Sequence, residues 1–323
     1  MKDIFQDDYK RKVKYVIDNN NDKVYLKGFS NFINKSNSTI YTYLLYVLNF
    51  MEYIQKDIKD LELDDYTEYL STIEDKSISY RISVYSALKK FSTYLNASNK
   101  NKLDPMKYVD RPQFCESIET KTKRENGYLE IKEIKKLLKA IDEGVGSNRA
   151  ISRQKEWTLR DKAIICILLN TGMRCSALYR LNIDNIDFDN NLIRVLDKGN
   201  KYKEYNISGD LLLIIKHWIS ARSIILNGKK EEALFISNQK TRIKQQTISN
   251  IVSKYSSVID GKNITPHKLR ATYGTQLYAK TGNLYMVQEC MGHSNPKTTE
   301  LYIRGQKNEV SKTASDIMSK LIF

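Results

Sequence analysis

The sequence predicts a mainly α-helical protein with one small antiparallel β-sheet, organised in two domains. Apolar residues recur at three- and four-residue spacing through residues 1–100, which is typical of amphipathic helices. The period changes to two between residues 186 and 207, as expected for strands. Residues 96–128 lose the periodicity and contain Pro105 and Pro112, which indicates a linker.

These patterns divide the chain into three parts. We assign residues 1–105 to an all-helical domain, residues 106–127 to the linker, and residues 128–323 to a mixed α+β domain. Ser38 or Thr39 can cap the third helix of the first domain. The expected helices of that domain span residues 8–19, 23–33, 38–55, 61–73 and 79–95.

The second domain is expected to alternate helices with a three-stranded antiparallel sheet. Its two hairpin turns fall at residues 189–191 and 197–201, and Gly199 can supply a positive φ in the second. The expected strands span residues 186–188, 192–196 and 202–207. The expected helices span residues 131–141, 157–169, 210–226, 245–259, 266–280, 284–291, about 296–302, and 311–323.

The charge balance points to a polyanionic partner. The net charge is +15, and an excess of this size draws a protein to nucleic acid, although a solubilising basic surface is the alternative. The N-terminus lacks the apolar region of a signal peptide, and the longest apolar run, residues 163–169, is too short to span a bilayer. The four cysteines lack metal-site or disulfide spacing. We therefore expect a cytoplasmic, nucleoid-associated protein.

The segment T-P-H-K-L-R has the features of a phosphate site at the start of a helix. Thr265 is a suitable N-cap and Pro266 a suitable first helical residue. His267 and Arg270 then lie three residues apart on one face, beside the free N–H groups of the first turn. Histidine and arginine at a helix start are also common on ordinary surfaces, so this segment alone is not decisive.

Four other residues are weak signals when each is taken alone. Arg174 follows a Thr-Gly break after a buried helix, and Lys198 lies on a hairpin tip. His293 follows a glycine at a helix end, and Tyr302 is one of 22 tyrosines. Surface exposure, solubility or helix capping would explain any one of them. Their order and context are more informative than any member.

In that order and context the sequence resembles the tyrosine recombinase (phage integrase) family, in particular its compact Xer-like members. The matching segments are T-G-M-R-C-S-A-L, K-G-N-K, T-P-H-K-L-R-A-T-Y-G-T and M-G-H-S-N-P-K-T-T-E-L-Y. The resemblance covers residues 128–305 and, more loosely, residues 23–105, where the family carries a helical, SAM-like core-binding domain. It implies that the mixed domain is the catalytic domain.

The resemblance implies a covalent mechanism. Tyr302 would attack the scissile phosphate and form a 3′-phosphotyrosyl bond, which conserves the phosphodiester energy, so that neither ATP nor a metal ion is needed. Arg174 and Arg270 would bind the non-bridging oxygens and offset the charge of the transition state. Strand exchange would then proceed through a Holliday junction.

The remaining roles are those of proton transfer and hydrogen bonding. Lys198 would protonate the leaving 5′-oxygen, His267 would help to deprotonate the tyrosine, and His293 would donate to a phosphate oxygen. The sequence departs from the family at Ala177, where an acidic residue is usual, and at Asp197, where glycine is usual. The first departure leaves open which residue orients the catalytic groups.

Basic and hydroxyl side chains outside these motifs are candidates for contacts with DNA. On the fifth helix they alternate with small hydroxyl residues, which suits phosphate contacts, although a solvated helix face is the alternative. The candidates are Thr42, Arg81, Lys89, Lys90, Lys201, Arg242 and Lys244.

The expected function is site-specific DNA recombination, either integration and excision of a mobile element or Xer-type resolution. The expected partners are double-stranded DNA with paired inverted core sites, three further copies of the chain in a tetramer held by residues 311–323, and an accessory or directionality protein. Packing of residues 311–323 on their own domain is the alternative to docking on a neighbouring copy. Two alternatives stay open: relaxation of supercoils by a type IB topoisomerase-like activity, and non-catalytic DNA binding on the same fold.

Overall fold

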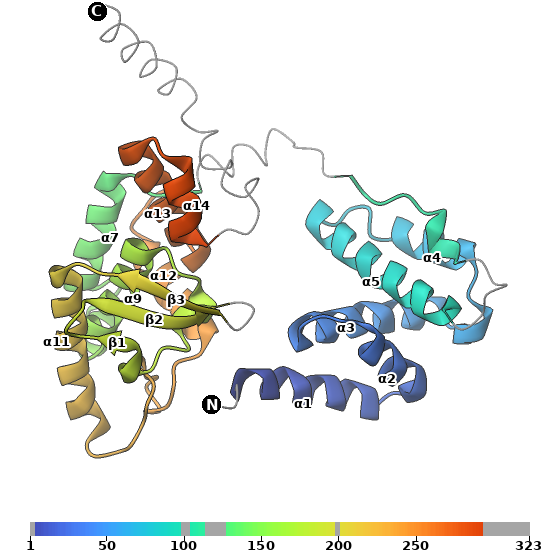
Figure 1. Ribbon diagram of the computed structural model, residues 1–323, viewed down its shortest axis with the longest axis horizontal. Helices are drawn as coiled ribbons and strands as arrows, with labels where there is room; N and C mark the ends of the chain where they lie inside the picture. Colours follow the sequence, from blue (N-terminus) through green and yellow to red (C-terminus); the bar gives the residue numbers. More distant parts are fainter. Residues whose placement is uncertain (1–3, 98–103, 114–126, 198–200, 293–323) are drawn as a thin grey trace, which may run out of the picture. The chain divides into compact units, whose positions relative to one another are not determined.

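The structure is a computed structural model that describes residues 4–97, 104–113, 127–197 and 201–292. The chain forms two compact units, residues 1–116 and 117–323, which are called here the helical unit and the mixed unit (Figure 1). The division lies within the linker predicted from the sequence. The precise bounds of that linker stay a prediction.

The helical unit is all α-helical in its described part, as the sequence predicts. Its first helix begins four residues earlier than expected. The elements are α1 (Ile4–Asp18), α2 (Lys23–Phe32), α3 (Asn37–Ile54), α4 (Leu63–Ser71) and α5 (Ile78–Asn96), with short 3-10 helices at Ile58–Asp60 and Pro105–Lys107.

One apolar cluster holds these helices together. Phe29 and Phe91 are fully buried, and their rings meet edge to face with centroids 5.1 Å apart. Met106 is also fully buried in this cluster, so the helical unit extends into the residues expected to begin the linker. The cap of α3 differs from the expectation, because Ser36 accepts the hydrogen bond from the backbone N–H of Thr39.

The mixed unit combines helices with one three-stranded antiparallel sheet of order β1-β2-β3. The strands are β1 (Ile186–Asp187), β2 (Leu192–Asp197) and β3 (Lys201–Asn206). The helices are α7 (Ile131–Glu143), α8 (Asn148–Lys155), α9 (Thr158–Thr171), α10 (Cys175–Leu178), α11 (Gly209–Leu226), α12 (Gln245–Ser256), α13 (Pro266–Thr281) and α14 (Leu284–Met291), with a 3-10 helix at Ile183–Asn185.

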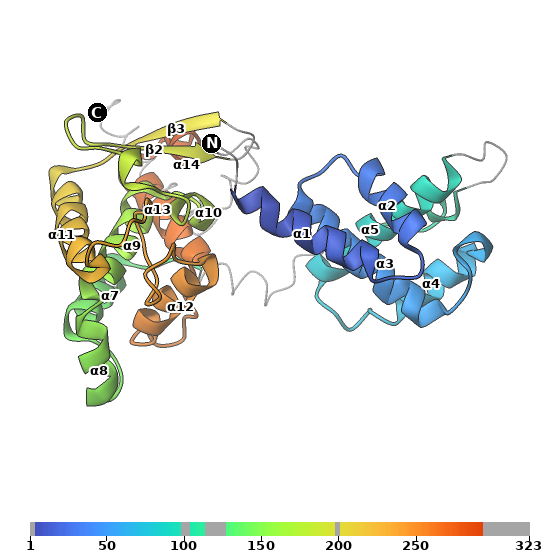
Figure 2. The same ribbon diagram turned by 90° about the horizontal axis from the view of Figure 1, so that it is seen from below.

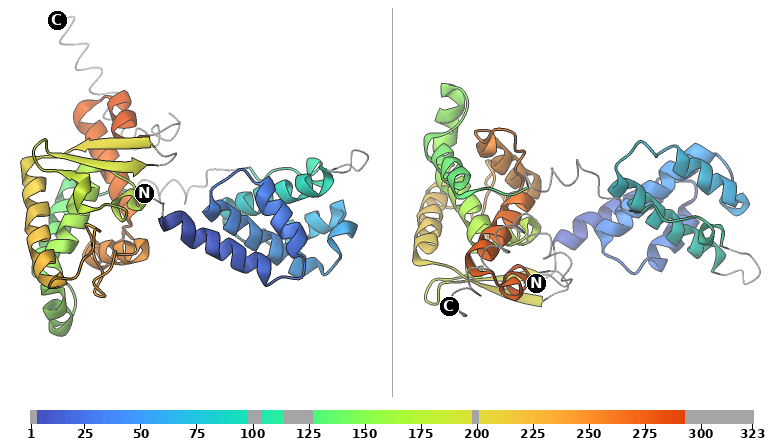
Figure 3. Two further views of the ribbon diagram at one scale, coloured as in Figure 1. Left: turned by 60° about the horizontal axis from the view of Figure 1, so that its bottom comes forward. Right: turned by 90° about the horizontal axis from the view of Figure 1, so that it is seen from above.

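Helix α9 is the centre of the mixed unit. It is apolar on nearly all sides and packs against α7, α11 and α13. The sheet forms a separate layer, with α9 and α12 on one side of it (Figure 2). Helices α13 and α14 lie beside β3 (Figure 3), which brings the end of the chain's described part next to the β2–β3 hairpin.

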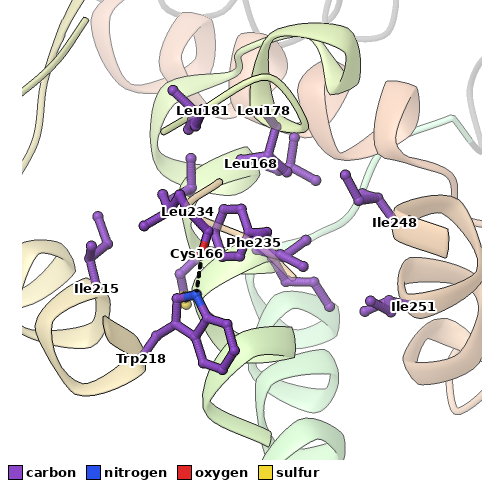
Figure 4. Close-up of a cluster of buried hydrophobic side chains, with 14 of the residues drawn as sticks. Cys166, Leu168, Leu178, Leu181, Ile215, Trp218, Leu234, Phe235, Ile248 and Ile251 are labelled. Carbon is purple, nitrogen blue, oxygen red and sulfur yellow. Dashed lines mark hydrogen bonds between the residues drawn. The ribbon is translucent and has the colours of Figure 1, made fainter. Parts of the chain in front are cut away.

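The core of the mixed unit also anchors the long connection between α11 and α12. Trp218 is fully buried and donates from Nε1 to the carbonyl oxygen of Leu234 at 2.9 Å (Figure 4). Its ring stacks on Phe235 with centroids 6.4 Å apart. A buried indole N–H needs such an acceptor, and the bond fixes this connection against α11.

The structure and the sequence-based expectations differ in a few elements. Helix α8 was not expected, because none of its residues is buried and it therefore lacks an apolar periodicity. The third strand begins one residue earlier than expected, since Lys201 pairs with Asp197. The helices expected at residues 296–302 and 311–323 lie outside the described residues. No described helix has the length and apolarity needed to cross a membrane.

Candidate active site

The turn between α9 and α10 positions Arg174. Helix α9 ends at Thr171, and Gly172 adopts a φ of 58°, which glycine tolerates without strain. A Cβ atom on Gly172 would lie 2.3 Å from Cδ1 of Tyr273, so the turn packs directly on α13. Arg174 follows as the N-cap residue of α10, and its place is therefore set by close packing of two helices.

The first turn of α13 has the capping that the sequence predicts. Thr265 accepts from the backbone N–H of Lys268 at 3.3 Å, and Pro266 is the first helical residue. His267 is exposed, whereas Arg270 is buried, with only 3% of its surface exposed. Partial desolvation of the imidazole, together with the nearby positive charge of Arg270, lowers the pKa of His267.

Arg270 connects two parts of the chain that are far apart in sequence. Its Nη1 donates to the carbonyl oxygen of Gly172, and its Nη2 donates to that of Met291. The first acceptor belongs to the turn after α9, and the second to the last residue of α14. Because the guanidinium is planar and rigid, these two bonds fix the position of α14 relative to the turn that carries Arg174.

Three cations meet at the C-terminal end of α14. We call residues 289–292 the α14 terminus. Arg174 donates from Nη2 to the carbonyl oxygen of Gly292 at 3.2 Å, and Arg270 reaches that of Met291. Lys203 on β3 donates from Nζ to the carbonyl oxygens of Cys290 at 2.6 Å and Glu289 at 3.1 Å. The negative end of the helix dipole favours cations at this position.

The arrangement can bind an anion. Two guanidinium groups that reach the carbonyl oxygens of adjacent residues are candidates to bind the oxygens of one phosphate, which is a stronger, charged acceptor. The imidazole of His267 lies on the first turn of α13, which also carries Arg270, and its lowered pKa favours the neutral form. A neutral imidazole can accept a proton. The site therefore combines anion binding with a base.

Residues 128–309, more than half of the 323 residues, match the phage integrase family. The chain belongs to the phage integrase family, the tyrosine recombinases. Its reaction class is therefore DNA strand breakage and rejoining. Among curated proteins, the chain is 28% identical over 250 residues to the tyrosine recombinase XerC of Shewanella sp. (strain ANA-3). That match covers 76% of this chain and 77% of the relative.

Solved structures of recombinases share the fold. The XerH site-specific recombinase in a post-cleavage complex with a palindromic difH substrate matches with a TM-score of 0.68 and 24% identity, over 87% of this chain and 80% of that chain. A lambda integrase tetramer bound to a Holliday junction matches with a TM-score of 0.62 and 13% identity, over 86% of this chain and 76% of that chain. The two-unit architecture is thus that of an Xer-like tyrosine recombinase.

The structure brings together three of the six catalytic residues predicted for this recombinase. Arg174 and Arg270 converge on the α14 terminus. The positive charge of Arg270 also contributes to the lowered pKa of His267. Lys198, His293 and Tyr302 lie outside the described residues. Their positions in the chain place Lys198 between β2 and β3, and His293 directly after Gly292.

In the helical unit of the recombinase, the predicted DNA contacts lie on α3 and α5. Lys89 and Lys90 are exposed, with Nζ atoms 5.4 Å and 5.3 Å from the ring centroids of Tyr85 and Phe32. Arg81 is partly buried on the same helix. Their contact with DNA stays a prediction, as does that of Thr42, whose hydroxyl donates to the carbonyl oxygen of Ser38 at 2.9 Å within α3.

In the mixed unit, the three predicted DNA contacts differ in their surroundings. Arg242 donates from Nη1 to the carbonyl oxygens of Tyr179 and Leu181, at 3.1 Å each. These bonds favour a structural role for Arg242, and burial lowers the pKa of its guanidinium. Lys244 is exposed at the start of α12. The structure does not describe the side chain of Lys201.

The sequence did not single out Lys203, although a signal was present. Lys203 shares a face of β3 with Tyr205, and Tyr202, Glu204 and Asn206 on the other face are exposed. A lysine on the apolar face of a strand must find acceptors, which the α14 terminus supplies. At the family's usual acidic position, Ala177 is 4% exposed and belongs to the apolar core of the unit.

Proposed function

We propose that this tyrosine recombinase cleaves DNA with Tyr302 and exchanges strands between two sites. The hydroxyl oxygen of Tyr302 attacks phosphorus, and the bond from phosphorus to the 5′-oxygen breaks. The tyrosine proton passes to His267, and Lys198 gives a proton to the leaving 5′-oxygen. The product is a 3′-phosphotyrosyl bond and a free 5′-hydroxyl. Attack by a 5′-hydroxyl of the partner duplex reverses these steps and restores a phosphodiester.

The convergence of Arg174 and Arg270 on the α14 terminus is the observation that carries this proposal. The two guanidinium groups donate to adjacent carbonyl oxygens, one residue and two residues before His293. Preorganised donors of this kind stabilise the charge that develops on phosphate oxygens during attack. The spacing also leads directly to the proposed nucleophile, which follows His293 by nine residues in the sequence.

The lowered pKa of His267 supports its role as the base. An imidazole that is neutral at pH 7 can take the proton of the attacking hydroxyl, whereas an imidazolium cannot. The direction of the shift follows first from desolvation and then from the charge of Arg270. Arg270, the proposed phosphate ligand, therefore also favours the neutral form of His267, which can act as the base.

The proposed partner is double-stranded DNA with paired inverted core sites. Two chains would bind each site, and four chains would form a homotetramer in which residues 311–323 dock on a neighbouring copy. Support comes from the relatives, since XerH is bound to a palindromic difH substrate and lambda integrase forms a tetramer on a Holliday junction. We place this assembly on the bacterial nucleoid in the cytoplasm, with integration, excision or resolution as its outcome, and with an accessory or directionality protein as a further partner.

A covalent capture experiment tests the proposal. Sheared genomic DNA of the source cells is incubated with the purified full-length chain, and fragments that stay attached in SDS are sequenced to find the site. A nicked suicide duplex of that site should then form an adduct with the wild type and with Tyr285→Phe, an exposed tyrosine of α14. Tyr302→Phe should form none. An adduct that survives in Tyr302→Phe would refute the proposed nucleophile.

A second assay separates recombination from relaxation. A supercoiled plasmid with two copies of the captured site is incubated with the wild-type chain. Recombinant products that depend on both sites support strand exchange. Relaxed plasmid without recombinant product, under all salt conditions and with either site orientation, would show that the chain acts as a topoisomerase.

A further inference from the structure

Lys203 lies on the inward face of β3. It is half-buried, and its Nζ is 4.9 Å from the ring centroid of Tyr205, which is 6% exposed. The residues on either side of it, Tyr202 and Glu204, are exposed. The lysine therefore points towards the protein interior, where a charged group is costly unless it is hydrogen-bonded.

Two carbonyl oxygens of the α14 terminus accept hydrogen bonds from Lys203. Its Nζ is 2.6 Å from the carbonyl oxygen of Cys290 and 3.1 Å from that of Glu289. A Cβ atom on Gly292 would lie 3.0 Å from the same Nζ, and Gly292 has a φ of 62°. The ammonium thus packs closely against the last turn of α14 and against the glycine that ends it.

In the described part of the chain, α14 contributes no residue to the main apolar core. Its buried residues, Val287 and Met291, belong to a small apolar cluster around Tyr278 that is separate from the main core of the unit. Tyr285 and Met286 are exposed. The hydrogen bonds from Arg174, Lys203 and Arg270 add to these apolar contacts and tie the terminus to other parts of the unit.

The three cations have different proposed roles in the reaction. Arg174 and Arg270 are the proposed phosphate ligands, so their guanidinium groups serve both the protein and the DNA. Lys203 contacts the carbonyl oxygens of Cys290 and Glu289, which precede the two residues that the arginines contact. It is therefore placed to hold the terminus while the arginines bind phosphate.

We propose that Lys203 is a positioning residue for strand cleavage. Its ammonium fixes the α14 terminus against β3, and through that terminus it sets the position of Arg174 and of the backbone that leads into His293. The inference rests on the proposed function, because the step that it supports is attack on the scissile phosphate. Loss of Lys203 slows cleavage without weakening DNA binding, since misplacement of reacting groups by about 1 Å lowers rates by roughly 100-fold.

Single-turnover cleavage of a nicked suicide duplex of the captured site tests this role. Lys203→Met should cleave roughly 10- to 100-fold more slowly than the wild type, with an unchanged Kd for the duplex. Lys203→Arg keeps a charged donor and should recover most of the rate. Lys216→Met is the matched control, because Lys216 is an exposed lysine whose Nζ lies 5.7 Å from the ring centroid of Phe188. It should cleave at the wild-type rate.

A double-mutant cycle with Arg174→Lys tests whether Lys203 acts through the terminus. If it does, Lys203→Met should slow Arg174→Lys much less than it slows the wild type, because the positioned group is already impaired. Equal slowing in both backgrounds would overturn the proposal. So would a Lys203→Met variant that cleaves at the wild-type rate or loses affinity for DNA in proportion to the rate.

A duplex with sulfur in place of the bridging 5′-oxygen separates positioning from acid catalysis. A thiolate leaves without a proton, so the Lys203→Met defect should persist on this substrate. A defect that disappears would make Lys203 a general acid and overturn the proposal. Wild type that forms no adduct on either duplex would instead refute the proposed function itself, so the two failures are distinguishable.

Discussion

Arg174 and Arg270 donate hydrogen bonds to the carbonyl oxygens of two successive residues, Gly292 and Met291. Arg174 is 118 residues from its acceptor in the sequence, so the pairing depends on how α9, α13 and α14 pack. The two arginines nevertheless differ in burial, because Arg270 is 3% exposed whereas Arg174 is only partly buried. We therefore expect both arginines to contribute to catalysis, and only Arg270 to contribute to stability as well.

Replacement of either arginine by alanine should lower single-turnover cleavage by about 100- to 1000-fold, the usual effect of losing one transition-state donor. Only Arg270→Ala should also destabilise the fold. It leaves the carbonyl oxygens of Gly172 and Met291 without their donor, at about 1–3 kcal/mol for each group that stays buried. Thermal unfolding and cleavage assays on both variants check this. Equal melting temperatures would contradict the structural role of Arg270.

Gly172→Ala should destabilise the mixed unit and slow cleavage. An alanine at a φ of 58° is strained by about 1–3 kcal/mol, and its Cβ would displace the ring of Tyr273, 2.3 Å away. Gly209→Ala is the matched control, because a Cβ there meets no atom within 4 Å. Thermal unfolding of both variants measures the effect. A Gly172→Ala variant as stable as the control would show that the turn is not constrained.

His267 should titrate below its ordinary pKa of 6.5. Between the folded-state pKa and 6.5, the unfolded chain then binds more protons at this residue than the folded chain does. The contribution of His267 to stability therefore rises with pH through that window and falls as the pH drops through it. NMR titration of the three histidines, with His267→Gln to assign the resonance, checks the direction. A midpoint at or above 6.5 would contradict it.

Asp161→Asn should strongly destabilise the mixed unit. Asp161 has no exposed surface and accepts from Arg160, Lys254 and Tyr255. Removing one partner of a buried ion pair costs about 3–5 kcal/mol, because the other charge stays buried. Chemical denaturation should show this loss.

The control for that measurement is Asp142→Asn. Asp142 pairs with Lys162 at 2.8 Å, but its side chain is 50% exposed. An exposed pair contributes at most about 1 kcal/mol, so the control should unfold close to the wild type. Similar losses in the two variants would mean that burial does not decide the strength of these pairs.

Local signals explain which elements could be predicted from the sequence. The cap at Thr265 and the break at Gly172 depend on neighbouring residues, and both are present in the structure as expected. Helix α8 was missed because it buries no residue. The hydrogen bonds of Arg242 also could not be foreseen, since their acceptors lie about 60 residues away, at Tyr179 and Leu181.

The sequence by itself determined the family and the two-unit organisation and predicted the kinds of residue that carry the chemistry, because motifs, charge and periodicity are properties of short segments. Only the tertiary structure decided that three cations from three elements meet at one helix end, and that Lys203 is one of them. The physical reason is that the last carbonyl oxygens of a helix lack partners within the helix, so they accept hydrogen bonds from donors that tertiary packing places beside them. In this chain, the turn between α9 and α10, strand β3 and helix α13 bring Arg174, Lys203 and Arg270 to that end.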